Sequence, residues 1–127
     1  MSKLLSDLDP IFLPIAQSLI QKCAEAGVPI AVIETRRTEA EHQAQVAKGL
    51  SWTKHSLHQD GLAIDVCPKE LLSIPRWRPE PPLWDTVGEI GERLGLRWGG
   101  RWKQKDLGHF EMQRVFPAGT PTAMEEA

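Results

Sequence analysis

Most of the side chains that could bind a metal or move a proton fall in three short stretches: Ser56-Leu57-His58, Ala63-Ile64-Asp65 and Asp106-Leu107-Gly108-His109-Phe110-Glu111. A catalytic zinc site takes three protein ligands from His and carboxylates and leaves a fourth position for water. His58 and Asp65 have Gly61 between them, a spacing that suits one ligand on a loop and the next on the strand that follows. His109 would supply the third ligand from a neighbouring strand. The three stretches therefore predict a zinc site made of His58, Asp65 and His109.

Hydrolysis at such a site also needs a group that moves a proton and a cation that stabilises negative charge. Asp106 lies three residues before His109, in the turn that leads into the same strand. From there it could take a proton from water and pass it to a leaving amine. Arg37, which follows an apolar strand, is the candidate cation for a developing oxyanion. We therefore predict that Asp106 is the acid/base and that Arg37 stabilises the oxyanion.

The other candidate side chains have simpler interpretations beside the chemical one. His42 falls on a polar helix face and is predicted to be solvated, with no role. His55 is either a fourth ligand or, as we prefer, a loop residue near the site. Glu111 is either a partner of His109 on the same strand face or an exposed strand residue. Because a lone histidine near a glycine is more often structural, a chain that binds no metal stays open as well.

Patterns along the chain predict the elements that must position these residues. Helices are predicted over 10–26, 38–48 and 83–94, and strands over 29–33, 61–66, 96–98 and 108–112. Asp9-Pro10 is typical of an N-cap followed by the first helical residue, and Thr38-Glu39-Ala40-Glu41 has the spacing of a capping box. The first helix is expected to bury one face, made of Ile11, Ile15, Leu19 and Cys23. Without a strand–helix–strand rhythm, the order predicts an α+β domain with helices packed on a small antiparallel sheet.

Length and composition bound the remaining possibilities. The 127 residues are enough for one domain with its own core, which we place at 1–116, followed by a flexible tail at 117–127. A net charge of −2 argues against a nucleic-acid binder, and no apolar run is long enough to cross a membrane. The N-terminus turns acidic at Asp7, too early for a signal peptide, which predicts a protein made in the cytoplasm. Cys23 and Cys67 fall in apolar patterns and are predicted to be free and buried.

A ten-residue motif and a downstream acid–histidine pair resemble the signature of the zinc D-Ala-D-Ala carboxypeptidase family: Ser56-x-His58-x-x-Gly61-x-Ala63-x-Asp65 and Asp106-x-x-His109-Phe110. That family includes the vancomycin-resistance D,D-dipeptidases and the phage L-alanyl-D-glutamate endopeptidases. It is grouped with the lysostaphin-type peptidases and the hedgehog signalling domain. The resemblance extends from about Ile33 to Glu111 and implies the hedgehog/D-Ala-D-Ala-peptidase fold.

The resemblance assigns roles residue by residue. His58, Asp65 and His109 match the ligands of one Zn²⁺ per chain, and Asp106 matches the catalytic acid/base. Arg37 matches an arginine that steadies the substrate carbonyl, although Arg36 beside it is the alternative. Ser56 matches a motif serine near the metal, where it contacts either the substrate or a metal ligand. Trp102 belongs to a stretch that resembles the phage branch, and it either lines the cleft or packs in the fold.

The resemblance implies a zinc peptidase acting on peptidoglycan stem peptides. Asp106 and the Trp98-Gly99-Gly100 turn resemble the phage branch and favour the L-Ala–D-Glu bond, with the D-Ala–D-Ala terminus as the alternative. That alternative would need a cationic pocket for a free carboxylate, for which the possible sources are Arg76, Arg78 and Arg101. A non-catalytic zinc module is the alternative of another class, and Asp106 argues against it.

The resemblance also bears on partners and location. It suggests a phage or prophage endolysin that is made without a signal peptide, passes through a separate membrane pore and degrades the cell wall. We expect a monomer with a peptide substrate, with no nucleic-acid partner and no membrane insertion. Residues 68–82 hold five prolines and predict a long loop, and whether that loop closes over substrate stays open.

Overall fold

The computed structural model describes residues 1–51, 55–72 and 81–113. Within them the chain forms three α-helices, α1 (Leu13–Glu25), α2 (Glu39–Ala47) and α3 (Pro81–Arg93), and four strands, β1 (Ile30–Glu34), β2 (Ala63–Pro68), β3 (Leu96–Trp98) and β4 (His109–Met112). The strands pair antiparallel throughout, in the order β1-β2-β4-β3. The predicted α+β class with a small antiparallel sheet is therefore confirmed.

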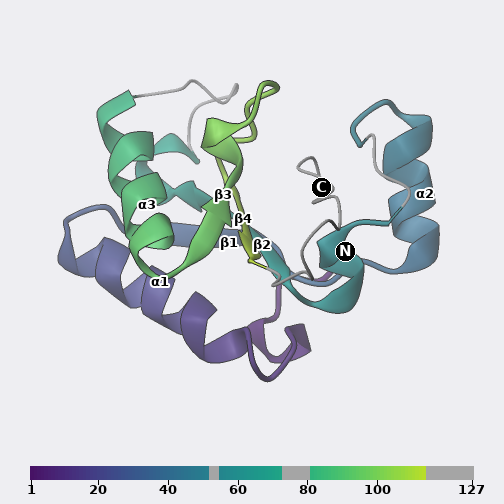
Figure 1. Cartoon of the computed structure of the whole chain (residues 1–127), viewed down its shortest axis with the longest axis horizontal. Coiled ribbons are helices and arrows are strands. Elements are labelled where there is room, and N and C mark those ends of the chain that lie inside the picture. Colours follow the sequence, from purple (N-terminus) through teal and green to yellow (C-terminus); the bar gives the residue numbers. More distant parts are fainter. Residues whose placement is uncertain (52–54, 73–80, 114–127) are drawn as a thin grey trace, which may run out of the picture.

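One face of the sheet carries the hydrophobic core. α1 and α3 pack against each other and cover this face, while α2 stands apart from them (Figure 1). Ile64, Phe110 and Trp98 lie in register across β2, β4 and β3, and all three are buried among the core residues. α3 approaches closely because it has glycine at Gly88 and Gly91, where an added Cβ would overlap the Trp98 and Phe110 rings.

The opposite face of the sheet carries the polar side chains, since successive side chains of a strand alternate between faces. Asp65 pairs in register with His109, and Glu111 lies between Ala63 on one side and Arg97 on the other. A register shift between Val32 and Glu34 in β1 brings Glu34 opposite Asp65. Such a bulge re-aims a side chain, and here it adds a carboxylate to the polar face.

The start of the first helix differs from the prediction. Asp9 does not cap α1. Its Oδ1 accepts a hydrogen bond from Ile11 N at 2.8 Å, which forms a turn, and α1 begins only at Leu13. The extra turn shifts the phase of the apolar face, so that Ile11 is 69% exposed. The buried face is made instead of Phe12, Ala16, Leu19 and Cys23.

The other predicted elements are present with end shifts of one or two residues. The capping box of α2 is confirmed: Thr38 Oγ1 accepts from Glu41 N at 3.1 Å, and Glu41 Oε1 accepts from Thr38 N at 2.9 Å. Cys23 and Cys67 are free and buried, as predicted. In the described ranges no helix is both long and apolar enough to cross a membrane. The predicted tail at 117–127 and most of the proline-rich loop lie outside the described residues.

Candidate metal centre and active site

The three predicted ligands converge on the polar face of the sheet. His58 comes from a short 3₁₀ turn (Leu57–Asp60), Asp65 from β2 and His109 from β4. One possible ligand atom from each lies within 4.8 Å of the others. Asp65 Oδ1 is 3.2 Å from His58 Nε2 and 2.9 Å from His109 Nδ1. Both imidazoles are buried, so the three donor atoms face one small volume.

The second nitrogen of each imidazole is held by an acceptor. His58 Nδ1 donates to the Thr35 carbonyl at 2.8 Å, which leaves Nε2 for a metal. His109 Nε2 donates to Glu111 Oε1 at 2.7 Å, which leaves Nδ1. Metal-binding histidines are usually oriented in this way, by a carbonyl or carboxylate on the other nitrogen. Two nitrogens and one carboxylate oxygen, all correctly aimed, fit the ligand set of a catalytic zinc site.

The charges at the centre also favour a cation. Burial alone raises the pKa of Asp65, but the charges of His58 and His109 and their hydrogen bonds lower it below its usual range, so Asp65 is ionised. Burial alone lowers the pKa of His109, but Asp65 and Glu111 raise it to about 10. In the absence of a metal, the positively charged His109 ring therefore lies between the carboxyl groups of Asp65 and Glu111. A divalent ion would replace a proton of that ring.

Asp106 lines the same cavity as the three ligands, which has a volume of about 290 Å³. Its main chain is fixed on both sides: Asp106 N donates to Gly99 O at 2.9 Å, and His109 N donates to Asp106 O at 3.1 Å. Partial removal from water and the nearby charge of Asp65 raise the pKa of Asp106 above its usual range. A carboxyl group that holds a proton more readily suits a role in which it accepts and then donates one.

Arg37, and not Arg36, lies in this cavity. Arg37 is 8% exposed, and its Nε and Nη2 each donate to Glu34 at 2.7 Å. Its Nη1 donates to His42 Nδ1 at 3.1 Å. These contacts use three of the five N–H donors of a guanidinium. Arg36 instead donates to the Asp7 and Asp60 carbonyls, away from the cavity.

The prediction for His42 was wrong. Its side chain is fully buried and holds Arg37, whereas the polar helix face predicted a solvated residue. A polar helix face can be buried when it packs against another polar group. The local sequence pattern does not distinguish such a buried face from one exposed to solvent. His55 is 56% exposed and pairs with Asp60 at 3.0 Å. Glu111 is buried against His109, so the first of its two interpretations is correct.

Ser56 contacts His58, whereas Trp102 lies beside His109. Ser56 is buried, and its Oγ accepts from His58 N at 3.1 Å, so it supports a predicted ligand from behind. The Trp102 ring lies 5.1 Å from the His109 ring and lines a second cavity. Arg101 lines that second cavity too, but donates to both oxygens of Glu92. Arg76 and Arg78 lie outside the described residues.

The fold and the centre together define an α+β domain with a His–Asp–His cluster that could hold a metal ion and a carboxylic acid beside it. The family described as D-alanyl-D-alanine carboxypeptidase matches residues 37–112 of the chain. The chain is also 32% identical over 124 residues to the peptidoglycan L-alanyl-D-glutamate endopeptidase CwlK of Bacillus subtilis, over 84% of this chain and 74% of CwlK. The chain therefore belongs to this family of peptidases, as the motif predicted.

Solved structures agree with that assignment. The Serratia marcescens L-Ala D-Glu endopeptidase ChiX superposes with a TM-score of 0.66 at 26% identity, over 86% of this chain and 83% of ChiX. A mutant of the vancomycin resistance D,D-pentapeptidase VanY, in complex with Zn(II), gives 0.58 at 21% identity, over 83% of this chain and 72% of VanY. At that identity the second comparison shows the fold alone. The predicted fold group and enzyme class are thus confirmed.

Proposed function

We propose that this chain is a zinc peptidase that hydrolyses peptidoglycan stem peptides at the L-Ala–D-Glu bond. The observation that carries the proposal is the convergence of His58, Asp65 and His109 with Asp106 in one cavity. Family membership supports the reaction type. CwlK and ChiX, whose names specify this bond, support its choice. The D-Ala–D-Ala bond is the second candidate, supported by the family description.

Each residue of the centre then has a task. His58, Asp65 and His109 would hold Zn²⁺, which would supply a Lewis acid able to activate water and polarise a carbonyl at neutral pH. Asp106 takes the proton from the attacking water and returns it to the departing amine. Arg37 keeps two N–H donors for the carbonyl oxygen while Glu34 and His42 hold its position.

The cellular setting follows as part of the same proposal. A substrate in peptidoglycan places the enzyme's action at the cell wall. An endolysin-like role with passage through a separate pore, and a monomeric state, stay predictions. A non-catalytic zinc module would need no acid beside the ligands, whereas Asp106 lines the cavity here.

Mass spectrometry of purified peptidoglycan fragments tests the bond directly. We expect the protein to release stems with a new free amine on D-Glu, and a chelator to stop the release. Loss of only a terminal D-Ala would move the enzyme to the carboxypeptidase reaction. No change of mass with zinc present would contradict the proposal and favour a binding module.

A substitution at Asp106 tests the proton transfer. Asp106→Asn should lower kcat by about 10²- to 10⁴-fold, because proton transfer by a placed group contributes that much, while zinc content stays near one per chain. Asp85→Asn removes an exposed carboxylate on α3 and serves as the matched control. Full activity of Asp106→Asn would show that another group moves the proton.

A further inference from the structure

Glu34 is a buried carboxylate beside the metal centre, and the proposed reaction uses it only to hold Arg37. It lines the cavity of the three predicted ligands, and the register shift in β1 brings it opposite Asp65. Its Oε1 lies 3.9 Å from His58 Nε2, which is the nitrogen that remains for a metal. Because zinc also accepts carboxylate oxygens as ligands, Glu34 places a fourth oxygen of the right type next to the centre.

Arg37 binds both oxygens of this carboxylate. Its Nε donates to Glu34 Oε2 and its Nη2 donates to Glu34 Oε1, each at 2.7 Å. A two-point pair of this kind fixes the orientation of the carboxylate and also matches its charge. The guanidinium is itself held, because its Nη1 donates to His42 Nδ1 at 3.1 Å. Within the described ranges, the cluster whose donor atoms lie within 4.8 Å of one another accordingly contains the three predicted ligands and not Glu34.

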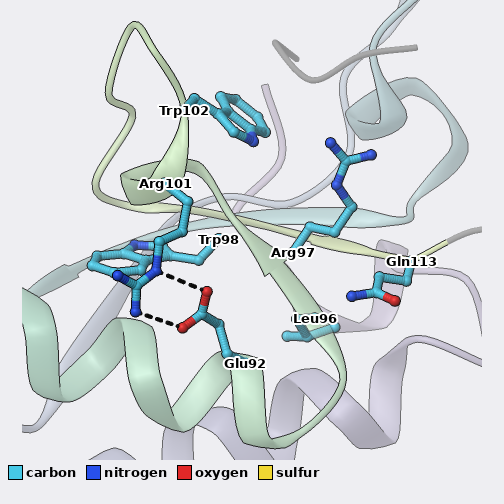
Figure 2. Close-up of a pocket in the computed structure, with 7 residues that line it drawn as sticks. All are labelled: Glu92, Leu96, Arg97, Trp98, Arg101, Trp102 and Gln113. Carbon is cyan, nitrogen blue, oxygen red and sulfur yellow. Dashed lines mark hydrogen bonds and ion pairs between the residues drawn. The ribbon is translucent and has the colours of Figure 1, made fainter. Parts of the chain in front are cut away.

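The chain has a comparable pair away from the three predicted ligands. Figure 2 shows Arg101 donating to both oxygens of Glu92. These two residues line the second cavity, of about 280 Å³, and are not among the described residues that line the cavity of the metal centre. They are also more exposed than Arg37 and Glu34. The Arg101–Glu92 pair therefore has the same bonding pattern without a predicted metal ligand beside its carboxylate.

We propose that Arg37 keeps the Glu34 carboxylate off the metal and thereby leaves one coordination position open for water. This inference rests on the metal site of the proposed function and deepens it. A catalytic zinc site has three protein ligands and an open position, whereas four protein ligands make a closed, structural site. A buried carboxylate that loses its counter-charge is strongly unfavourable. Without Arg37, Glu34 would therefore bind the divalent ion beside it, and the site would close.

Three variants, compared with the wild type, test the inference. Arg37→Gln leaves Glu34 without its ion pair, and Arg37→Gln/Glu34→Gln removes the carboxylate as well. Arg101→Gln is the matched control, because it breaks the comparable pair with Glu92. All four proteins are purified in the presence of zinc, and competition with a chromophoric chelator measures their zinc affinity. A crystal structure of zinc-loaded Arg37→Gln shows the ligands of the ion directly.

The expected result is a tighter but closed metal site in Arg37→Gln. Its zinc affinity should rise by about tenfold or more, because a charged protein ligand is added. In its crystal structure, an oxygen of Glu34 should lie about 2.0–2.2 Å from the zinc ion. Arg37→Gln/Glu34→Gln should lose the gain in affinity, since no carboxylate is left to bind. Arg101→Gln should bind zinc as the wild type does.

Zinc bound in Arg37→Gln without Glu34 among its ligands would overturn the inference, even with a higher affinity, because the lost positive charge alone would explain the rise. Should Arg37→Gln not fold with zinc, Arg37→Lys decides, since lysine keeps the charge but lacks the fork that holds both oxygens. A Glu34 oxygen on zinc in that variant supports the inference, and Glu34 paired only with the introduced amine overturns it. A wild type that binds zinc but cleaves no stem peptide would overturn the proposed function and leave this inference standing. A wild type that binds no zinc would overturn both.

Discussion

At the scale of single residues, the two histidines proposed as ligands differ in what holds their second nitrogen. His58 donates to a neutral carbonyl, that of Thr35, whereas His109 donates to the carboxylate of Glu111. A charged acceptor makes an imidazole a stronger electron donor and fixes its ring orientation. The strength of the metal site should therefore depend on Glu111 although this residue does not reach the ion.

Replacing Glu111 tests that dependence. Glu111→Gln keeps the size of the side chain but removes its charge, so zinc affinity should fall about 10- to 100-fold. Competition with a chromophoric chelator measures the affinity. Glu92→Gln, which removes the carboxylate paired with Arg101, is the control and should bind zinc as wild type does. An unchanged affinity of Glu111→Gln would show that Glu111 does not tune the site.

Zinc binding should release a proton from His109. In the metal-free protein the pKa of His109 is raised to about 10, so its imidazole is protonated at neutral pH, and a metal must displace that proton. Zinc affinity should rise with pH between about 6 and 9, by close to tenfold per unit for one proton. Calorimetry in two buffers of different ionisation enthalpy should detect about one proton per zinc. A heat independent of buffer would contradict this assignment.

Some residues of the candidate site could be predicted from the sequence and others could not, and the two groups act in different ways. The convergence of His58, Asp65 and His109 could be predicted because a metal requires particular donor types at close spacing, and those types stand out in a chain with only four histidines. His42 could not, because it acts through Arg37, a partner that folding brings near. Glu111 lay between these cases, since strand alternation suggested its partner.

At the scale of elements, the turn after β3 fixes the position of the proposed acid/base. Gly99 accepts from the main chain of Asp106, and the two segments touch so closely that an added Cβ at Gly99 would overlap the Asp106 carbonyl. That carbonyl in turn accepts from His109 N. The glycine therefore sets the distance between the acid and the metal centre.

A methyl group at Gly99 should displace Asp106. Gly99→Ala is expected to lower kcat by about tenfold to a hundredfold, since a misplacement of about 1 Å can cost that much. Gly95→Ala is the control: its φ of +88° makes alanine unfavourable, but a Cβ there meets nothing within 4 Å. The control should lose about 1 kcal/mol of stability and keep its kcat. Equal kcat values for the two variants would show that the turn does not position Asp106.

Helices and strands were predicted correctly from the sequence where the local sequence signals were strong. The capping box at Thr38 and Glu41 and the strand alternation around Asp65 were read correctly, because they depend on neighbouring residues alone. The start of α1 was misread because Asp9 forms its hydrogen bonds in a turn that resembles a cap in sequence. The bulge that aims Glu34 at Asp65 left no recognisable signal, since it depends on the register with β2.

At the scale of the whole molecule, the metal centre joins parts of the chain that are distant in sequence. Its proposed ligands come from the 3₁₀ turn, β2 and β4, and Thr35 and Glu111 accept hydrogen bonds from the two histidines. The unfolded chain has no such preformed site, so zinc should bind the folded state far better. The free energy of binding then adds to the free energy of folding.

Zinc should accordingly raise the melting temperature, and a chelator should reverse the rise. A free zinc concentration a thousand times its Kd should add about 4 kcal/mol to the free energy of unfolding. Thermal unfolding with and without zinc measures the effect. Asp65→Ala removes one proposed ligand and should abolish the rise, whereas Asp60→Ala, which removes the carboxylate paired with His55, should retain it. A rise of equal size in Asp65→Ala would place the bound zinc elsewhere.

The α+β class followed from the order and length of the elements. The sequence did not show which face of the sheet packs on the helices and which carries the candidate site. Helices α1 and α3 both cover one face (Figure 1). The side chains of the candidate site lie on the other face. Strand alternation predicts that each strand has two faces. The face that the helices cover depends on side-chain packing across the sheet. An example is the close contact of the α3 glycines with the Trp98 and Phe110 rings.

The place of Trp102 gives this protein a spectroscopic reporter. The chain has five tryptophans and no tyrosine, so its ultraviolet emission comes from indole alone. Trp84 and Trp98 are buried in the core, whereas the Trp102 ring lies 5.1 Å from the ring of His109. A positively charged imidazolium quenches the fluorescence of a nearby indole. An imidazole with a metal on one nitrogen has lost the second proton and is no longer an imidazolium. The brightness of Trp102 should therefore follow the occupancy of the centre in real time, without a label and without turnover.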